Sequence, residues 1–509
     1  MDRRRFLLAA AAAASPLVAR EQTATLSVHP DRPGARIPVR YTGLSYESSQ
    51  LAEPDFFSAK NRDLAALFKR LSARGVLRIG GNSSEFTWWK ASPEAVAPAL
   101  KPPPGPADAN WMPHELSPIT PQAIDNLAGF LDAAGWKLIY GLNLGTGTPE
   151  RAAEEAASVA KTIGTRLEYF QIGNEPDLYP RANNGLRPPT WGFDNYLSEW
   201  LKFASAIFAR VPFARLAGPD VASDSDWIAR FASEAPPKVS DAIVSLTGHY
   251  YAMGPPDDPR VNIERLLAPG PEAAARVARI AQIAADAHLP FRMAEGNSCY
   301  RGGKPGMSDA FASALWAADY MMMTARAGYA GVNFHGGGTR QIRAALGGHL
   351  PGEAVATKPA AAAARSGAFY TPIAGSLEEG FEPRPIFYGI MLGDQFGGTT
   401  AVATEFDAQS VNATAYAAKT ASDLRVAILN KDADHDLRVK IDPGWPPKPA
   451  RVWLLSALTL DATTGVTLAG KEVGTGGSWK PVEEGLRPDK HGIFTLDVPR
   501  ASGALVFFL

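Results

Sequence analysis

The segment Leu167-Glu-Tyr-Phe-Gln-Ile-Gly-Asn-Glu-Pro176 carries the strongest indication of the fold. An apolar run typical of a buried strand leads into a turn, and the turn holds the carboxylate of Glu175. The segment Leu289-Pro-Phe-Arg-Met-Ala-Glu-Gly-Asn297 repeats this pattern, with Glu295 in the corresponding place. In sheets with parallel strands, ligands bind at the carboxyl ends of the strands. The two segments therefore predict an α/β protein with two carboxylates at the rim of one site.

Strand and helix patterns alternate on both sides of these segments. The clearest helical pattern has Thr148 as N-cap and Pro149 at its first position, and it ends before Gly164. Eight strands, most followed by a helix, predict a (β/α)8 barrel over residues 41–397. A doubly wound open sheet is the alternative. The predicted strands are Tyr41–Tyr46, Val76–Ile79, Lys137–Asn143, Leu167–Ile172, Leu216–Gly218, Ile243–His249, Pro290–Glu295 and Gly331–His335.

Polar side chains stand at or just past most of these strand ends. A barrel of this type draws its active-site residues from the ends of several strands. The candidate positions are Asn82, Asn143, Asn174, Glu175, Asp220, His249, Tyr250, Glu295 and His335.

The segments outside the barrel pattern are of three kinds. In residues 20–40, two alternating stretches flank Asp31-Arg-Pro-Gly34, which predicts a β-hairpin. Residues 398–509 lose the helical pattern, which predicts a C-terminal β-sandwich. Two loops interrupt the barrel pattern, at Val96–Asn110 and at Gly336–Gly375, and we expect the second at the rim of the site. The predicted sandwich strands are Ala413–Ala418, Leu424–Asn430, Ala450–Leu455, Ile493–Val498 and Ala504–Leu509.

Residues 1–19 have the pattern of a signal peptide. A basic start, the short apolar run Phe6–Ala14 and the small residue Ala19 follow one another in the expected order. Arg3-Arg4-Arg5 matches the twin-arginine pattern, which sends folded proteins across a bacterial inner membrane. An ordinary secretory signal and an uncleaved anchor are the alternatives. We therefore expect a periplasmic or extracellular protein without a membrane anchor after cleavage.

Composition limits the classes of partner. The 509 residues include 51 basic and 52 acidic side chains, a formal net charge of −1, so a nucleic acid is not an expected partner. The same balance weighs against a densely sulfated polymer as the main substrate. The one cysteine, Cys299, excludes an internal disulfide, and we expect it to be buried and inert. No spacing of His, Cys and carboxylates indicates a metal, and no cofactor is expected.

Two carboxylates at strand ends are the pair that glycoside hydrolysis needs. One acid protonates the leaving oxygen, while the other carboxylate attacks the anomeric carbon or activates a water. The alternative for either glutamate alone is a cap on the helix that follows.

Five motifs together resemble glycoside hydrolase family 79, which contains β-glucuronidases and the heparanases. They are Gly43-Leu-Ser-Tyr-Glu, Arg78-Ile-Gly-Gly-Asn, Gly173-Asn-Glu-Pro, Gly248-His-Tyr-Tyr and Glu295-Gly-Asn-Ser. The resemblance implies a barrel whose β-sandwich is completed by the N-terminal hairpin, and a retaining mechanism. It also implies that Glu175 is the acid/base and Glu295 the nucleophile.

The resemblance extends to sugar-binding residues. Asn174 corresponds to the residue that binds the sugar 2-hydroxyl, and Tyr300 and the Gly302 amide to the groups that hold the sugar carboxylate. We expect Arg301 to point away from the pocket, and Tyr370 to line it.

Four further strand-end residues have weaker assignments. We predict that Tyr250 donates a hydrogen bond to Glu295 or to the sugar, although one of the pair Tyr250 and Tyr251 must face the barrel core. Glu47 and Asn82 are candidate binders of sugar hydroxyls, or else a solvated loop and a cap. His249 is expected to be structural rather than catalytic.

Three functions fit these residues. The first is a retaining exo-β-glucuronidase that removes terminal glucuronic acid from glycosides or polysaccharides. The second is an endo-acting, heparanase-like hydrolase, and the third is a non-catalytic carbohydrate-binding protein on the same scaffold. A deep closed pocket would favour the first function, and an open basic cleft the second.

Overall fold

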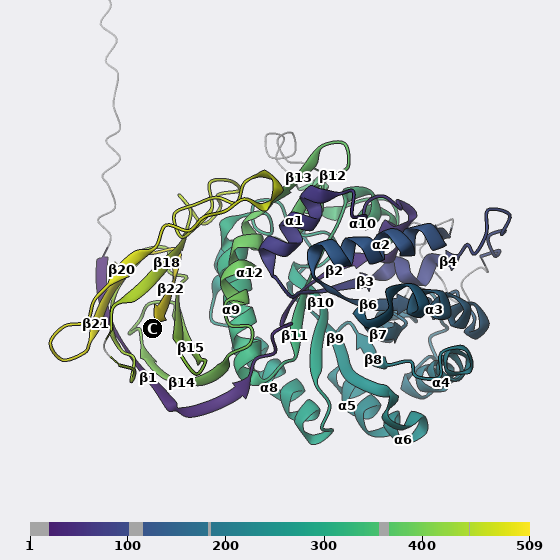
Figure 1. Ribbon diagram of the computed structural model, residues 1–509, viewed down its shortest axis with the longest axis horizontal. Coiled ribbons are helices and arrows are strands. Elements are labelled where there is room, and N and C mark those ends of the chain that lie inside the picture. The colour runs from purple at the N-terminus through teal and green to yellow at the C-terminus, as the bar shows by residue number, and fades with distance from the viewer. Residues whose placement is uncertain (1–19, 101–115, 182–184, 356–365, 447) are drawn as a thin grey trace, which may run out of the picture.

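The computed structural model describes residues 20–100, 116–181, 185–355, 366–446 and 448–509. A barrel and a curled sheet lie side by side, with the helices α9 (Phe311–Ala327) and α12 (Pro385–Asp394) between them (Figure 1). The predicted signal peptide and most of the loop at Val96–Asn110 lie outside the described residues. Among the described residues, no helix is both long enough and apolar enough to span a bilayer.

The barrel is closed by eight parallel strands, which confirms the prediction and makes the open-sheet alternative wrong. Each strand pairs with the next along the chain, and β11 closes the ring by pairing with β2. The strands are β2 (Thr42–Glu47), β3 (Val76–Gly80), β6 (Lys137–Leu142), β7 (Leu167–Ile172), β8 (Leu216–Val221), β9 (Ile243–Met253), β10 (Phe291–Cys299) and β11 (Gly331–Gly336).

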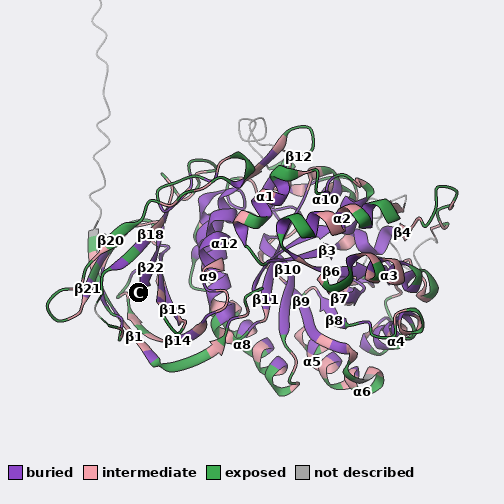
Figure 2. Ribbon diagram, in the orientation of Figure 1, coloured by how far each residue is buried: buried purple, intermediate pink, exposed green. Residues whose placement is uncertain are grey.

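Helices surround the strands, and several have the caps that the sequence indicates. The side chain of Thr148 accepts a hydrogen bond from the Arg151 N–H at the start of α3, and Gly164 ends that helix. The outer helices are α1 (Arg62–Leu71), α2 (Pro121–Ala134), α3 (Pro149–Ile163), α4 (Phe193–Arg210), α5 (Ser225–Glu234), α6 (Pro236–Val239), α7 (Ile263–Leu267), α8 (Pro271–Asp286) and α10 (Thr339–Ala345). Figure 2 shows that α9 and α12 are buried along most of their length, because the sheet covers the face that outer helices expose.

Short elements complete the barrel loops. Two small sheets pair β4 (Thr87–Trp89) with β5 (Ser117–Ile119) and β12 (Ile373–Ser376) with β13 (Gly380–Pro383). The single-turn helices are η1 (Ser48–Ala52), η2 (Asn82–Phe86), η3 (Gly164–Arg166), η4 (Pro176–Leu178), η5 (Ser240–Ala242), η6 (Pro351–Ala354) and η7 (Thr475–Gly477). The segment Gly336–Gly375 was expected to be a long loop, but α10 and η6 form within it.

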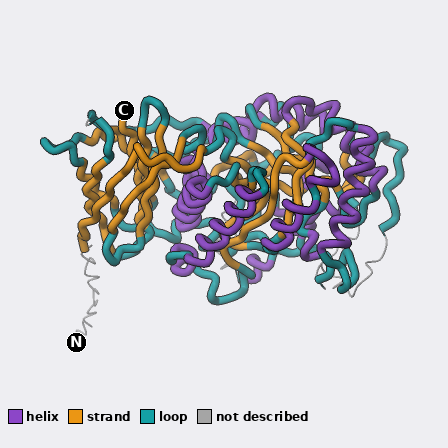
Figure 3. The backbone as a smooth tube through the Cα atoms, turned by 90° about the horizontal axis from the view of Figure 1, so that it is seen from below, coloured by secondary structure: helices purple, strands orange, loops and turns teal. Residues whose placement is uncertain are grey.

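The predicted sandwich is one continuous sheet that curls over its own core (Figure 3). Adjacent residues of β16 pack into two different hydrophobic cores, one on each face of the sheet, because side chains alternate along a strand. Val426 packs in the core of the sheet, while Ala427 packs against the barrel side. The strands are β1 (Arg20–Arg36), β14 (Thr400–Asp407), β15 (Ala413–Lys419), β16 (Leu424–Asn430), β17 (His435–Asp442), β18 (Ala450–Ser456), β19 (Thr467–Leu468), β20 (Glu484–Leu486), β21 (Phe494–Val498) and β22 (Ser502–Phe508).

The predicted N-terminal hairpin is wrong, although the segment does join the C-terminal sheet. Strand β1 continues in one direction for 17 residues and lies between β14 and β17. It pairs antiparallel with β14 and parallel with β17, so Leu26 faces both Phe406 and Ile441. Where a turn was expected, the pairing with β14 only slips in register, between His29 and Arg36. Pairing with β14, which resumes at Pro33 and Arg36, therefore holds the chain extended through Asp31-Arg-Pro-Gly34.

A half-buried carboxylate joins the barrel to the sheet. Asp319 of α9 lies 2.5 Å from the Lys431 ammonium and accepts hydrogen bonds from the hydroxyls of Tyr416 and Thr414, each at 2.7 Å. The Lys431 side chain is only 5% exposed, so its charge depends on Asp319 for compensation.

Candidate active site

A cavity of about 360 Å³ lies at the carboxyl ends of the barrel strands. Both predicted catalytic glutamates line it. Its lining residues are Glu47, Asn82, Glu85, Phe86, Asn174, Glu175, Leu178, Arg181, Leu186, Ala222, Ser223, Tyr251, Glu295, Tyr300, Arg301, His335, Ile342, Ala345, Leu346 and Tyr370.

Glu175 stands in the turn that follows β7. Its backbone has a φ of 48°, in the left-handed region that non-glycine residues seldom adopt. The Glu175 N–H donates to the carbonyl of Asp220 at 2.9 Å, and the preceding Asn174 N–H donates to the carboxylate of Glu85. Asp220 and Arg301, which also belong to the site, have φ values of 60° and 59°. Strained backbone of this kind is concentrated at functional sites, where the surrounding structure enforces it.

Glu295 lies within β10 and is held by three side chains. Arg78 Nη1 donates to Glu295 Oε2 at 2.7 Å, and the Tyr251 hydroxyl donates to Oε1 at 2.8 Å. His335 Nδ1 lies 3.6 Å from Oε2. These contacts orient the carboxylate and stabilise its ionised form.

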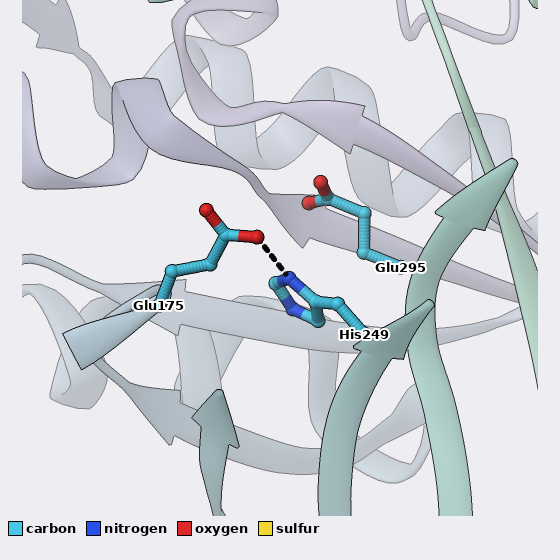
Figure 4. Close-up of side chains that lie close together, drawn as sticks. All are labelled: Glu175, His249 and Glu295. Carbon is cyan, nitrogen blue, oxygen red and sulfur yellow. Dashed lines mark hydrogen bonds and ion pairs between the residues drawn. The ribbon is translucent and has the colours of Figure 1, made fainter. Parts of the chain in front are cut away.

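A chain of buried charges connects the two glutamates. Arg78 Nη2 lies 2.6 Å from Asp220 Oδ2, and the same oxygen lies 3.3 Å from His249 Nε2. On the other side of the ring, His249 Nδ1 lies 3.0 Å from Glu175 Oε1 (Figure 4). Arg78 and Asp220 are each only 1% exposed. His249 thus contacts the proposed acid/base directly, which its strand-end position alone did not indicate.

The environments of Glu175 and Glu295 shift their pKa values in opposite directions. Burial raises the pKa of Glu175, and the Glu295 charge raises it too, against a lowering influence of His249. Burial would also raise the pKa of Glu295, but His335, His249, Arg78 and the Tyr251 hydrogen bond together hold it well below its usual range. One carboxyl is therefore set up to carry a proton while the other is ionised.

His249 is cationic at neutral pH in this setting. Burial lowers its pKa, but the charges of Asp220 and Glu295 outweigh burial and raise the pKa to about 10. The pKa of Asp220 moves down, because Arg78 and His249 outweigh the effect of its burial.

The same groups could offer three ligands to a metal ion. One atom each of Glu175, His249 and Glu295 lies within 4.8 Å of the others. The Arg78 guanidinium already donates to Glu295, and His249 is protonated, so the arrangement fits a proton-transfer pair better than a cation site.

Most of the sequence-predicted sugar-binding residues lie at the cavity. Glu47, Asn82, Asn174, Tyr300 and Tyr370 line it with the two catalytic candidates. Asn174 accepts a hydrogen bond from Arg78 at 2.8 Å and donates to Asn82 at 3.1 Å.

The prediction for Tyr250 is wrong. Its ring stacks on Tyr320 of α9, with centroids 4.8 Å apart, on the outer side of the barrel. Tyr251 is the residue that donates to Glu295. Side chains alternate along β9, so His249 and Tyr251 share the inner face and Tyr250 takes the outer one.

The loop after Glu295 also differs from expectation at two positions, Arg301 and Gly302. Arg301 was expected to point away, but it lines the cavity, and its guanidinium lies 5.9 Å from the centre of the Tyr300 ring. Gly302 is not among the lining residues, and its carbonyl accepts a hydrogen bond from the Phe369 N–H at 2.7 Å. Cys299 is fully buried, as expected.

Four residues of the site received no specific role from the sequence, although Asp220 was among the candidate strand-end positions. Arg78, Asp220 and Tyr251 contact the glutamates or their partners, and Glu85 contacts the turn that carries Glu175. The sequence did offer a signal for Arg78, since it is a charged residue inside the apolar run Val76–Ile79. A charge buried in a strand needs partners of opposite charge, so Arg78 could have been predicted to contact carboxylates.

Comparison with known proteins supports the fold and indicates a class of relatives. No family model matches the chain. A β-glucuronidase from Aspergillus niger is 26% identical over 317 residues, and one from Neurospora crassa is 26% identical over 347 residues. The matches cover 57% and 61% of this chain, and the chain spans only 56% and 60% of the length of these relatives.

Solved structures share the fold over nearly the whole chain. A 4-O-α-L-rhamnosyl-β-D-glucuronidase from Fusarium oxysporum 12S, in complex with Rha-GlcA, has a TM-score of 0.71 and 18% identity, with 95% of this chain and 100% of that chain covered. A GH51 arabinofuranosidase from Xanthomonas axonopodis pv. citri has a TM-score of 0.66 and 14% identity, with 96% and 100% covered. In sequence the chain is similar to two β-glucuronidases, and its fold is that of these glycoside hydrolases.

Proposed function

We propose that this protein is a retaining exo-β-glucuronidase that releases terminal β-linked glucuronic acid from glycosides or polysaccharides. The observation that carries the proposal is the pair Glu175 and Glu295, which have oxygens within 4.8 Å of each other and pKa values shifted in opposite directions. Retaining glycosidases hold their carboxyl groups about 5–5.5 Å apart, whereas inverting ones leave about 6.5–9.5 Å for a water. The sequence likeness to two β-glucuronidases supports glucuronate as the sugar.

In the first step, Glu295 attacks the anomeric carbon while Glu175 gives its proton to the leaving oxygen. The bond to the leaving group breaks as the bond to Glu295 Oε forms, and a covalent glycosyl-enzyme results. Arg78 and Tyr251 keep Glu295 ionised and oriented before this step. Asn174, held between Arg78 and Asn82, is placed to bind the sugar 2-hydroxyl.

In the second step, Glu175 acts as a base toward water. The charge of Glu295 is one of the influences that raise the pKa of Glu175, and it disappears once Glu295 is esterified. The pKa of Glu175 then falls, so the same carboxylate can take a proton from the water that attacks the sugar. The cation of His249, 3.0 Å away, stabilises the ionised form that this step requires.

The two glutamates define two sides of the cavity. The leaving group must lie beside Glu175, and the lining residues from the loops after β7 and β8 include Leu178, Arg181 and Ser223. The sugar must lie against Glu295, whose loop also carries Tyr300 and Arg301. A phenol and a guanidinium both donate hydrogen bonds to a carboxylate, which fits the C6 carboxylate of glucuronate.

Exo action is supported by the size of the cavity. A volume of about 360 Å³ is near the lower end of the range for small-ligand pockets, about 300–1,000 Å³. Walls from η2, α10 and the Tyr370 segment surround it. Such a pocket suits one terminal sugar better than the middle of a chain.

One assay tests the proposal. Purified protein is given an aryl β-glucuronide and the matching aryl β-glucoside, and chromophore release is compared at equal substrate concentration. We expect kcat/KM for the glucuronide to exceed that for the glucoside by about 100-fold or more, since each hydrogen bond to a charged group contributes about 1.5–3 kcal/mol. Equal rates would contradict the assignment of the sugar. Release of internal fragments from a glucuronate-containing polymer would support endo action instead.

The retaining mechanism is tested by the first-formed product and by two variants. Proton NMR during turnover should show β-glucuronic acid before it mutarotates. Glu295→Gln should lose about 10⁴-fold or more in kcat, as expected when a covalent nucleophile is removed. Glu175→Ala should retain turnover of substrates with good leaving groups and regain rate with azide, which needs no base. An α-anomer as first product would show inversion.

We also propose that the protein is exported through the twin-arginine route. The support is the sequence Arg3-Arg4-Arg5-Phe6-Leu7 before a short apolar run. Replacing both Arg3 and Arg4 by Lys should abolish periplasmic accumulation in a bacterial host. Undiminished periplasmic protein would point to another route.

A further inference from the structure

The buried carboxylate of Glu85 connects three loops of the site. Glu85 belongs to η2, which follows β3, and it is 2% exposed. One of its oxygens accepts the N–H of Asn174 after β7, and the other accepts the N–H of Gly145 after β6. A single side chain thus fixes the relative positions of the loops at the ends of three barrel strands.

The Asn174 N–H is the last main-chain donor before Glu175. One residue further along the chain, the Glu175 N–H donates to the Asp220 carbonyl at 2.9 Å. The turn between these two hydrogen bonds holds Glu175 at its positive φ of 48°. A left-handed non-glycine residue costs about 1–3 kcal/mol, so the turn relaxes to another conformation unless such contacts hold it.

The surroundings of Glu85 supply one main-chain donor to each of its oxygens. A methyl group on Gly145 would come within 2.8 Å of the carboxylate oxygen, so an alanine at this position would push the carboxylate aside. Burial raises the pKa of Glu85, and the N–H donors of Gly145 and Asn174, the nearby Tyr179 hydroxyl and Arg187 offset this only in part, so the pKa lies at about 7. Arg187 is itself fixed by the carbonyls of Gly145 and Leu144, at 2.8 Å and 3.1 Å.

We propose that Glu85 is a positioning residue for the acid/base: through the Asn174 N–H it sets the direction in which Glu175 presents its proton to the leaving group. The inference rests on the proposed function of Glu175. It requires a carboxylate, because each of its two oxygens accepts from one N–H. In Glu85→Gln one acceptor becomes an NH₂ group that faces an N–H, so one of the two loops must move.

The chain offers a matched control in Glu155. This glutamate is also buried, at 4% exposure, and burial raises the pKa of Glu155 to about 7 as well. It lies on α3 and accepts a hydrogen bond from Tyr140 at 2.6 Å, with no contact to the Asn174–Glu175 turn. Glu155→Gln therefore reports the general cost of replacing a buried carboxylate in this barrel.

The experiment compares wild type, Glu85→Gln and Glu155→Gln on phenyl and 2,4-dinitrophenyl β-glucuronide. Glu85→Gln should lose about 100-fold in kcat/KM on the phenyl substrate, which needs the proton, and no more than about threefold on the dinitrophenyl substrate, which does not. Glu155→Gln should lose little on either. Equal losses of Glu85→Gln on both substrates, or losses equal to those of Glu155→Gln, would overturn the proposal.

A second readout does not depend on turnover. In a crystal structure of Glu85→Gln, Glu175 should no longer lie within hydrogen-bond distance of His249 Nδ1, whereas in Glu155→Gln this contact should persist. If Glu175 does not move in Glu85→Gln, the inference is overturned, whether or not the wild type hydrolyses glucuronides. If the wild type is inactive on glucuronides, only the proposed function is removed. Should Glu85→Gln fail to fold, Gly145→Ala displaces the same carboxylate without changing its charge, and it should show the same dependence on leaving group.

Discussion

Arg78 and Glu295 form a buried ion pair, with Nη1 2.7 Å from Oε2, in a barrel strand where the guanidinium is only 1% exposed. The same guanidinium contacts Asp220 at 2.6 Å, so one cation is shared by two carboxylates. Each remaining donor of Arg78 also has an acceptor, including Gln171 Oε1 at 2.8 Å. The proposed nucleophile is therefore fixed by a planar group that lysine cannot imitate.

Arg78→Lys tests this relationship directly. A lysine keeps the charge, but it cannot reach Glu295 and Asp220 together with fixed geometry. We expect kcat/KM to fall by about 100-fold or more, since two or more hydrogen bonds to charged groups, at about 1.5–3 kcal/mol each, are lost or weakened. The pKa of Glu295 should rise, so the acid limb of the kcat/KM profile should move to higher pH. An unchanged pH profile of kcat/KM would show that the planar arrangement of the guanidinium donors is unimportant.

Tyr251→Phe and Tyr250→Phe form a matched pair on neighbouring positions. Tyr251 donates to Glu295 at 2.8 Å, whereas Tyr250 stacks on Tyr320 outside the barrel. Loss of one hydrogen bond to a charged group should cost Tyr251→Phe about 10-fold to 100-fold in kcat/KM. Tyr250→Phe should stay within about threefold, because it keeps the ring that makes the contact. The reverse ranking in steady-state kinetics would restore the original assignment to Tyr250.

Arg301→Ala and Tyr300→Phe test how the sugar carboxylate is held. Both side chains line the cavity beside Glu295. A guanidinium can bind a carboxylate through two parallel hydrogen bonds, so Arg301→Ala should cost the glucuronide at least as much as Tyr300→Phe, which should lose about tenfold. The weak glucoside activity should hardly change in either variant. If Arg301→Ala leaves the ratio of the two substrates intact, the Tyr300 hydroxyl and the Gly302 amide remain the anchor that the sequence suggested.

His249→Gln should change the pH dependence in a defined direction. Wild-type His249 is cationic below about pH 10, and its charge lowers the pKa of both Glu175 and Glu295. Without it, Glu175 should keep its proton to higher pH, and the alkaline limb of kcat/KM should move upward by roughly one unit. The rate itself should fall, because the second step needs an ionised Glu175. A downward shift of the alkaline limb would contradict this electrostatic role.

Asp319→Ala tests the junction between the barrel and the sheet. The substitution leaves the Lys431 ammonium, 5% exposed, without its carboxylate 2.5 Å away. Breaking a buried pair in this way costs about 3–5 kcal/mol of unfolding free energy, which urea denaturation can measure. Activity per folded molecule should not change, since Asp319 does not line the cavity. If the free energy of unfolding falls by less than about 1 kcal/mol, apolar packing rather than this ion pair stabilises the junction.

The sequence was sufficient for the barrel because its strands are buried apolar runs and several of its helices have side-chain caps. All eight predicted runs became barrel strands, and the helix predicted after Thr148 begins at Pro149. The prediction of an N-terminal hairpin is wrong, because it relied on a local turn motif. The motif Asp31-Arg-Pro-Gly34 has only a local preference for a turn, and main-chain pairing with β14 on either side of it overrides that preference.

Within the site, the sequence located the two glutamates but not what surrounds them. Their strand-end position is a local property, which a single sequence displays. The contacts of Arg78 with Glu295 and Asp220 join residues more than a hundred positions apart, and no local pattern encodes them. The choice between Tyr250 and Tyr251 depends on which residues of β9 face the inside of the barrel. The contact of His249 with Glu175 shows that His249 faces inward, and Tyr251, two residues later, therefore faces inward as well.

The placement of β1 has a consequence for the order of assembly during translation. The ribosome completes β1 hundreds of residues before β14 and β17 exist, yet β1 lies between these two strands. Until residue 407 has emerged, both edges of β1 keep unpaired main-chain donors and acceptors, and the edge that pairs with β17 keeps them until residue 442. Contacts so distant in sequence form slowly. The sheet therefore closes only after the entire barrel has been synthesised. An export route that accepts folded proteins alone would in this way admit only chains in which β1 has already paired with β14 and β17.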